Sequence, residues 1–242
     1  MLCLLRSLVF LALQIVITPV FTLIALICCP LPALVRYQVI SCWSKILIVA
    51  LQYICGIRYE VFGRENIPTQ PCIILCKHQS AWETLALQSI FPPQVWVLKK
   101  ELLWIPFFGW GLATLSPIAI NRRAGTKALK HMAIEGKKRL AAGFFIVIFP
   151  EGTRVAPGTR IPYQPGGAWL ARKTNCPVVP VAHNAGTCWP KNALIKYPGV
   201  IRVYIGKPID PTGLSTDALL YQVENWIEEK MLTLSPHAKP PA

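Results

Sequence analysis

Two long apolar segments open the chain and predict a pair of helices. The first segment runs from residue 8 to residue 29 without a formal charge, and a helix of that length can cross a hydrocarbon core of about 30 Å. Thr18-Pro19 interrupts this segment and could kink the helix. The second segment runs from residue 39 to residue 55 and contains Lys45 with aromatic residues near both ends, a pattern typical of a helix at a membrane interface.

A turn-like Cys-Pro-Leu-Pro stretch at residues 29–32 separates the two segments, so we expect a membrane-anchoring helical hairpin over residues 1–56. A cleaved signal peptide is the alternative. It is disfavoured because the apolar stretch is long and no small-x-small cleavage pattern follows it. Hydropathy alone leaves open whether the hairpin spans the bilayer or enters one leaflet.

From residue 57 onward, short β-branched runs alternate with segments of helical periodicity. This alternation predicts an α/β domain over residues 57–234, with a mixed, mainly parallel sheet covered by helices. We expect strands over 57–62, 72–76, 95–98, 117–120, 144–149, 177–181 and 200–205. We expect helices over 84–88, 126–142, 168–174 and 216–231. The last eight residues, 235–242, contain three prolines and are expected to be disordered.

The composition indicates contact with a membrane and binding of an anionic partner. The chain has 242 residues, of which 53% are hydrophobic and 15% charged, whereas soluble domains carry about 25% charged residues. The net charge of +14 would attract nucleic acid, acidic phospholipid headgroups, or a phosphorylated substrate and a phosphopantetheine carrier. The apolar N-terminus favours lipid, so we expect membrane lipids and no nucleic acid as partners.

The nine cysteines are an odd number and form no Cys-x-x-Cys pair. Most of them lie inside apolar runs, which indicates small buried side chains in a reducing compartment. We therefore expect neither a disulfide framework nor a metal site.

Candidate chemistry lies at residues 77–83, which read KHQSAWE between a predicted strand and a predicted helix. The carboxyl ends of strands in open α/β sheets border the crevice in which ligands bind. Histidine suits proton transfer near neutral pH, and a nearby carboxylate can orient its ring. His78 is therefore a candidate general base and Glu83 its orienting partner.

Other interpretations of this stretch remain open. The spacing from Ser80 to Glu83 matches a capping box, in which the glutamate only accepts an N–H at the helix start. A single histidine after a buried strand is often structural. Ser80 is a rival nucleophile, although no nucleophile elbow surrounds it.

A second stretch, FPEGTR at residues 149–154, also follows a predicted strand. Together with His78-x-x-x-x-Glu83 it resembles the glycerophospholipid acyltransferase family, whose motifs are His-x-x-x-x-Asp and Phe-Pro-Glu-Gly-Thr-Arg. The resemblance extends from about residue 61 to residue 207 and is greatest, in size and layout, to bacterial 1-acyl-glycerol-3-phosphate acyltransferases. The supporting segments in order are KELLWIP at 100–106, FFGW at 107–110, INR at 120–122 and VVPV at 178–181.

Two departures from the family pattern stand out. Glu83 replaces the usual aspartate and is one methylene longer, which puts the orienting role in doubt more than the role of the base. Relatives often carry a lysine before a glycine ahead of the next helix, whereas residues 164–168 here read QPGGA. A phosphate contact from that helix start would have to come from backbone N–H groups.

The resemblance implies a function. It implies transfer of a fatty acyl group from acyl-CoA or acyl carrier protein to the sn-2 hydroxyl of 1-acyl-sn-glycerol 3-phosphate (lysophosphatidic acid), which gives phosphatidic acid without a bound cofactor. It also implies a location at the bacterial inner (cytoplasmic) membrane, with the catalytic domain on the cytoplasmic side. Acylation of another lysolipid or of glycerol 3-phosphate, and non-catalytic binding of anionic lipid, are the alternatives. The expected substrate-binding residues are Lys100, Arg122, Glu151, Gly152, Thr153 and Arg154.

Overall fold

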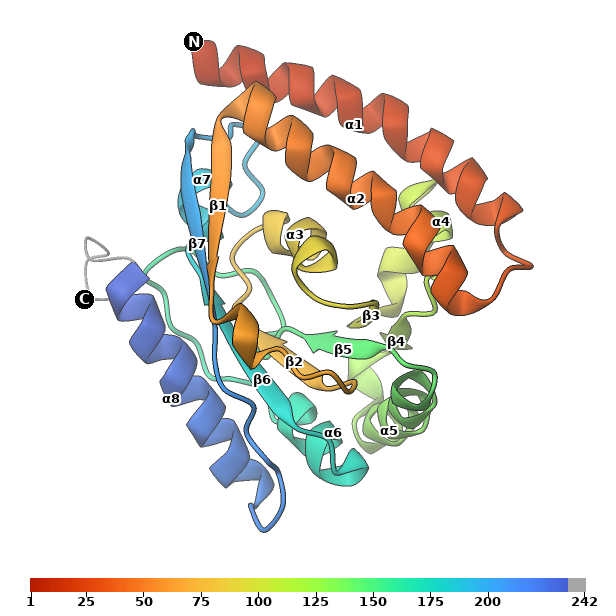
Figure 1. The fold of residues 1–242 in the computed structure, drawn as a ribbon, viewed down its shortest axis with the longest axis vertical. Helices are drawn as coiled ribbons and strands as arrows, with labels where there is room; N and C mark the ends of the chain where they lie inside the picture. Colours follow the sequence, from red (N-terminus) through yellow and green to blue (C-terminus); the bar gives the residue numbers. More distant parts are fainter. Residues whose placement is uncertain (235–242) are drawn as a thin grey trace.

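The structure, a computed structural model, describes residues 1–234, apart from the side chain of Arg122. The tail at 235–242, which the sequence predicts to be disordered, lies outside the described residues. Seven strands form one sheet in the order β1-β7-β6-β2-β5-β3-β4 (Figure 1). The strands are β1 (Ile57–Phe62), β2 (Ile73–Cys76), β3 (Gln94–Lys99), β4 (Ile118–Ile120), β5 (Phe145–Ile148), β6 (Val178–His183) and β7 (Gly199–Ile205).

The sheet is mainly parallel, as the alternating pattern predicts. The five strands β6, β2, β5, β3 and β4 pair in parallel. β7 pairs antiparallel with β6, and β1 pairs in parallel with β7. The carboxyl ends of the five parallel strands therefore meet at one edge of the sheet, where ligands bind in open α/β folds.

Helices cover both faces of the sheet (Figure 1). One face carries α5, α6 and α8, while α3 and the N-terminal helix α2 lie on the other. Their bounds are α2 (Ala33–Cys55), α3 (Trp82–Ile90), α5 (Thr126–Ala141), α6 (Gly166–Thr174) and α8 (Thr216–Leu234). Short elements connect them: η1 (Arg64–Asn66), η2 (Lys100–Trp104), α4 (Phe108–Thr114), η3 (Arg122–Ala124) and α7 (Ala185–Cys188).

The central strands β2 and β5 form the core. Every residue of both strands is buried, which is why each strand reads as a continuous apolar run rather than an alternating one. Burying a side chain such as Ile74 or Val147 contributes about 1.5–3 kcal/mol relative to leaving it exposed. The loops at the ends of these strands are therefore held on a rigid base.

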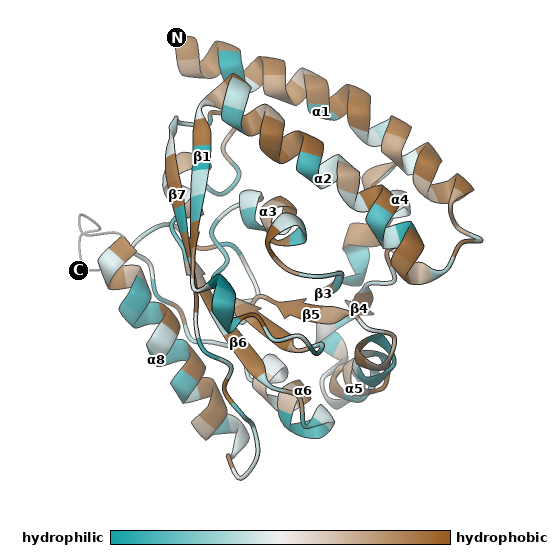
Figure 2. Ribbon diagram, viewed as in Figure 1, coloured by the Kyte–Doolittle hydropathy of each residue, from teal (hydrophilic) through white to brown (hydrophobic). Residues whose placement is uncertain are grey.

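The N-terminal helices form an apolar layer over α3. α1 (Leu2–Ile27) continues through Pro19 and packs against α2 and α4, while α2 packs against α3 and β1. The outer face of α1 is exposed and apolar; Ile15 and Val16, for example, are 64% and 67% exposed (Figure 2). Both helices are long and apolar enough to cross a membrane. This exposed surface indicates membrane association.

Two details of the helices differ from the sequence-based expectation. α2 begins at Ala33 rather than at residue 39, because Arg36 does not interrupt the helix: its guanidinium donates to the C=O of Cys29, 2.8 Å away, at the end of α1. The short helices α4 and α7 were not expected. In α4 the turn is tight, since a Cβ on Gly109 would lie within 2.5 Å of the Leu103 carbonyl oxygen.

Candidate active site

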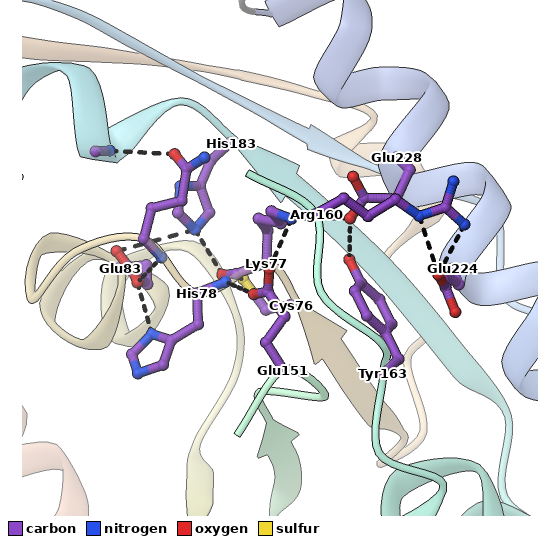
Figure 3. Close-up of polar contacts among 12 residues, drawn as sticks. Cys76, Lys77, His78, Glu83, Glu151, Arg160, Tyr163, His183, Glu224 and Glu228 are labelled. Atoms are coloured by element: carbon purple, nitrogen blue, oxygen red, sulfur yellow. Dashed lines mark hydrogen bonds and ion pairs between the residues drawn. The ribbon is translucent and has the colours of Figure 1, made fainter. Parts of the chain in front are cut away.

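His78 lies directly beyond the carboxyl end of β2, and its ring contacts a carboxylate from the start of α3. Nδ1 of His78 lies 2.8 Å from Oε1 of Glu83 (Figure 3). The ring also stacks on Phe149, with the two ring centroids 3.9 Å apart and the planes 13° from parallel. These two contacts hold the imidazole in one orientation.

Glu83 combines the two roles that the sequence left open. The same Oε1 atom accepts the backbone N–H groups of Gln79 (3.0 Å) and Ser80 (2.8 Å). The contact with Ser80 is the glutamate half of a capping box. The longer glutamate side chain thus satisfies the backbone at the helix start while it still contacts His78.

The protonation state of this pair follows from its surroundings. Burial by itself would raise the pKa of Glu83, but the nearby His183 and His78 rings and the N–H of Ser80 outweigh burial and hold the pKa below its ordinary value. An ionised Glu83 only accepts hydrogen bonds, so Nδ1 of His78 is assigned the proton. Nε2 of His78 then has a lone pair that can accept a proton from a substrate.

Ser80 does not have the surroundings of a nucleophile. Its side chain is fully buried, and its Oγ accepts the N–H of Trp82 at 3.1 Å. Ser80 therefore stabilises the start of α3 instead of facing a ligand.

Glu151 lies behind His78 rather than in front of it. Its Oε2 accepts the backbone N–H of His78 at 2.6 Å, and its Oε1 lies 2.6 Å from Nζ of Lys77. Burial raises the pKa of Glu151 to about 7, although Lys77 and the N–H of His78 act in the opposite direction. This geometry argues against the prediction that Glu151 binds substrate, because both of its oxygens are turned toward the protein interior.

His78 lines a cavity of about 430 Å³ whose lining has a polar part and an apolar part. In the polar part, His78 is accompanied by residues of the FPEGTR loop, by a lysine at the end of β3 and by residues of the loop between α7 and β7. These polar lining residues are Gly152, Thr153, Arg154, Lys99, Lys191 and Asn192. The cavity can therefore hold an anion beside the imidazole.

The apolar part of the lining comes mainly from the N-terminal helices and the aromatic segment that follows β3. It includes Phe21 of α1, Trp43 of α2, and Phe108 and Leu112 of α4, and the rings of Trp43 and Phe108 are in contact, with centroids 6.2 Å apart. This wall fits the hydrocarbon part of a lipid. Trp104, Phe107 and Trp110 of the same aromatic segment are exposed, so this segment both lines the cavity and adds to the apolar surface.

The structure brings together only part of the predicted site. His78, Gly152, Thr153 and Arg154 line the cavity, and Glu83 contacts Nδ1 of the His78 ring. Lys100 lies on η2 outside the cavity lining, and its neighbour Lys99 lines the cavity instead. Arg122 begins η3, but its side chain lies outside the described part of the chain.

The sequence also missed Lys99 and Lys191. Lys99 ends β3, so the rule that strand ends carry the site could have identified it. Lys191 belongs to the loop between α7 and β7, where its Nζ lies 3.5 Å from Oγ1 of Thr153. No local pattern marks that loop. Within residues 1–234, no group of three or more His, Cys, Asp or Glu side chains is placed to hold a metal ion.

Known proteins are similar to this chain in sequence and in fold. The chain is 46% identical over 210 residues to the 1-acyl-sn-glycerol-3-phosphate acyltransferase of Pseudomonas aeruginosa, an alignment that covers 85% of this chain and 82% of that protein. It is 29% identical over 198 residues to the enzyme of that name from Saccharomyces cerevisiae, covering 79% and 65% of the two proteins. The crystal structure of the 1-acyl-sn-glycerophosphate acyltransferase from Thermotoga maritima superimposes with a TM-score of 0.81 at 25% identity, covering 96% of this chain and 95% of that one. A sequence model described as Acyltransferase matches residues 58–184, and the chain therefore belongs to the acyltransferase family.

Proposed function

We propose that this acyltransferase moves a fatty acyl group from acyl-CoA or acyl carrier protein to the sn-2 hydroxyl of 1-acyl-sn-glycerol 3-phosphate, which gives phosphatidic acid. The observation that carries the proposal is the cavity beside His78, whose lining combines cations with many apolar side chains. A lysophosphatidic acid has the same polarity, with a phosphate at one end and a hydrocarbon chain at the other. The names of the relatives support the same acceptor.

The reaction proceeds by direct transfer, with His78 as the general base. Nε2 of His78 takes the proton of the acceptor hydroxyl as that oxygen attacks the thioester carbonyl carbon. A C–O bond forms and the C–S bond breaks, and the leaving thiolate receives the proton from the imidazolium. Glu83 stabilises the transient positive charge of the ring. The hydroxyl, the imidazole and the leaving thiolate supply and accept every proton and electron pair of this reaction. The proposal therefore includes no covalent acyl-enzyme and no bound cofactor or metal.

The phosphate of the acceptor is bound by the polar residues of the cavity lining. Arg154 supplies a planar guanidinium that matches a phosphate, and Lys99 at the end of β3 and Lys191 in the loop after α7 add positive charge. Gly152 has no side chain, which lets the backbone approach the ligand closely. Its φ of +69° is also one that other residues rarely adopt. Thr153 adds a hydroxyl. Lys100, which lies outside the cavity lining, stays in the proposal as an outer cation that attracts the anionic substrate before it enters. Arg122 stays in the proposal as a phosphate-binding residue on the family resemblance alone.

The hairpin α1–α2 places this chemistry at a membrane. Both helices contribute residues to the cavity wall while α1 presents an exposed apolar face. We place the protein at the inner (cytoplasmic) membrane of a bacterium with the α/β domain on the cytoplasmic side, where acyl-CoA and acyl carrier protein are present. A lipid acceptor can then reach the cavity without crossing water.

An acceptor panel tests this function. Purified protein in phospholipid vesicles receives a labelled acyl-CoA, and in parallel an acyl carrier protein thioester, together with lysophosphatidic acid, glycerol 3-phosphate or a neutral lysolipid. We expect labelled phosphatidic acid from the first acceptor at a rate at least tenfold above the others. Preference for another acceptor would replace the substrate, and binding of anionic lipid without transfer from either donor would support a non-catalytic lipid-binding protein.

A further inference from the structure

A set of buried charges extends from the back of His78 to the C-terminal helix α8. Lys77 is only 1% exposed, and its Nζ lies 2.6 Å from Oε1 of Glu151 and 2.8 Å from Oε1 of Glu228. Glu228 belongs to α8 and also accepts the hydroxyl of Tyr163 at 2.8 Å. Figure 3 shows this network, Lys77–Glu151–Glu228–Tyr163, on the side of the backbone opposite the His78 ring.

Burying a lysine with two carboxylates is a costly way to stabilise a core. Taking such charges out of water requires a large desolvation free energy, and apolar side chains of similar volume often stabilise as well or better. The arrangement therefore indicates a role that apolar packing could not fill. Fixing the geometry of a neighbouring group is such a role.

The neighbouring group is the backbone of His78. Its N–H donates to Glu151, and its C=O accepts the N–H of Val155 at 2.8 Å. The preceding carbonyl, that of Lys77, accepts Nε2–H of His183 at 2.8 Å. The tautomer of His183 follows from its other nitrogen, which accepts the N–H of Ala185. All three polar groups around the His78 peptide are thus held, and Glu151 links one of them to the charge network.

Successive contacts link Glu228 of α8 to the backbone of His78. Glu228 fixes the ammonium of Lys77, the ammonium fixes the carboxylate of Glu151, and that carboxylate fixes the N–H of His78. A shift of His78 by a fraction of an ångström would change the distance from its ring to Glu83 and to a bound hydroxyl. Misplacement of about 1 Å can slow a reaction about 100-fold.

We infer that Lys77 and Glu228 are positioning residues for the acyl transfer, through which helix α8 holds the backbone of His78 in its reactive place. This inference rests on the proposed function, because it assigns the network to the rate of the step that His78 performs. Neither residue touches the substrate cavity.

The test compares two glutamates on α8. Glu228→Gln removes the carboxylate that α8 contributes to the network. Glu224→Gln removes a carboxylate one turn away on α8 that pairs with the exposed Arg160. We expect Glu228→Gln to lower kcat about tenfold with the KM for the acceptor unchanged, and Glu224→Gln to keep kcat within twofold. Lys77→Met should lower kcat by about 100-fold, since it leaves Glu151 without its cation. The double variant should lose no more than Lys77→Met alone, because Glu228 acts through Lys77.

Two further readouts separate positioning from simple loss of folded protein. All rates are divided by the folded fraction from circular dichroism, and the Nδ1 proton of His78 is followed by NMR without substrate. We expect its resonance to shift or broaden in Glu228→Gln and to stay unchanged in Glu224→Gln. A full kcat per folded molecule in Glu228→Gln, or equal losses in both variants, would overturn the inference; if Glu228→Gln does not fold, Glu228→Asp takes its place. Because the NMR signal needs no substrate, failure of the proposed function would appear separately, as absent transfer by the unaltered protein.

Discussion

Two buried glutamates hold His78 from opposite sides, and they differ in what they hold. Glu83 contacts the ring and has a pKa held below the ordinary value, whereas Glu151 contacts the backbone and has a pKa raised to about 7. Both are almost completely buried. Burial alone therefore does not set the charge of a carboxyl group; the number and geometry of its partners decide whether it stays ionised.

The difference separates a chemical role from a positional one. Glu83 must be negative to orient the proton on Nδ1 and to stabilise the imidazolium. Glu151 needs only to accept one N–H and one ammonium. Activity should therefore depend on the negative charge of Glu83 at the His78 ring, and on the position of Glu151 at the His78 backbone.

Of the two glutamates that hold His78, Glu83 is expected to give the larger effect on kcat when it is replaced by glutamine. The amide oxygen can still accept the N–H groups of Gln79 and Ser80, but the negative charge beside His78 is lost. We expect kcat to fall about 100-fold, which is the lower limit of what general base catalysis typically contributes. The thermal unfolding midpoint should change little. Steady-state kinetics with lysophosphatidic acid would measure this fall. Unchanged kcat would assign Glu83 to helix capping alone.

A smaller effect is expected from the lysines at the end of β3. Lys99→Ala should raise the KM for the acceptor about tenfold, because Lys99 lines the cavity and loss of a charged hydrogen bond costs about 1.5–3 kcal/mol. Lys100→Ala is the matched control, since the adjacent side chain lies outside the cavity lining. Its KM should stay within twofold, and the opposite order of the two values would return the phosphate contact to Lys100.

The smallest effect is expected in the pH dependence of stability. The pKa of Glu151 is raised from an ordinary 4.5 to about 7 by burial, so the folded chain binds more protons than the unfolded chain between these pH values. Stability should therefore fall as pH rises through this window. Glu151→Gln has no carboxyl group at this position that could titrate. Between pH 5 and pH 8 its unfolding midpoint should therefore fall by a few degrees less than the midpoint of the unaltered protein. Parallel curves for the two proteins would contradict the raised pKa.

The sequence predicted all seven strands: the central ones are short apolar runs, whereas β1 and β7 alternate between apolar and polar residues. Buried strands such as β2 carry the apolar pattern without interference from tertiary contacts. α4 was missed because its glycines and aromatic residues hide a helical period, and the tight approach at Gly109 is a tertiary feature. The start of α2 was predicted too late because only the apolar run from residue 39 was taken as helical, whereas the helix also includes the polar residues Arg36 and Gln38.

The site was predictable where its parts are close in sequence. His78 and Glu83 lie five residues apart at a strand-to-helix junction, so a local pattern contains the pair. Lys77 was not singled out by the sequence, because its partner Glu228 lies 151 residues later in α8. Lys191 reaches the cavity from an irregular loop for a similar reason. Contacts of this range depend on the folded sheet, which no local pattern encodes.

The most direct test of the account is phosphatidic acid formation by His78→Ala beside the unaltered protein and His131→Ala, a control at an exposed histidine of α5. The assay uses vesicles that contain lysophosphatidic acid, a labelled thioester donor and folded protein in equal amounts. We expect His78→Ala to lose at least about 1000-fold in kcat, within the range for a lost general base, while it still binds lysophosphatidic acid and His131→Ala keeps full activity. Turnover by His78→Ala within tenfold of the unaltered protein would contradict the assignment of His78 as the base.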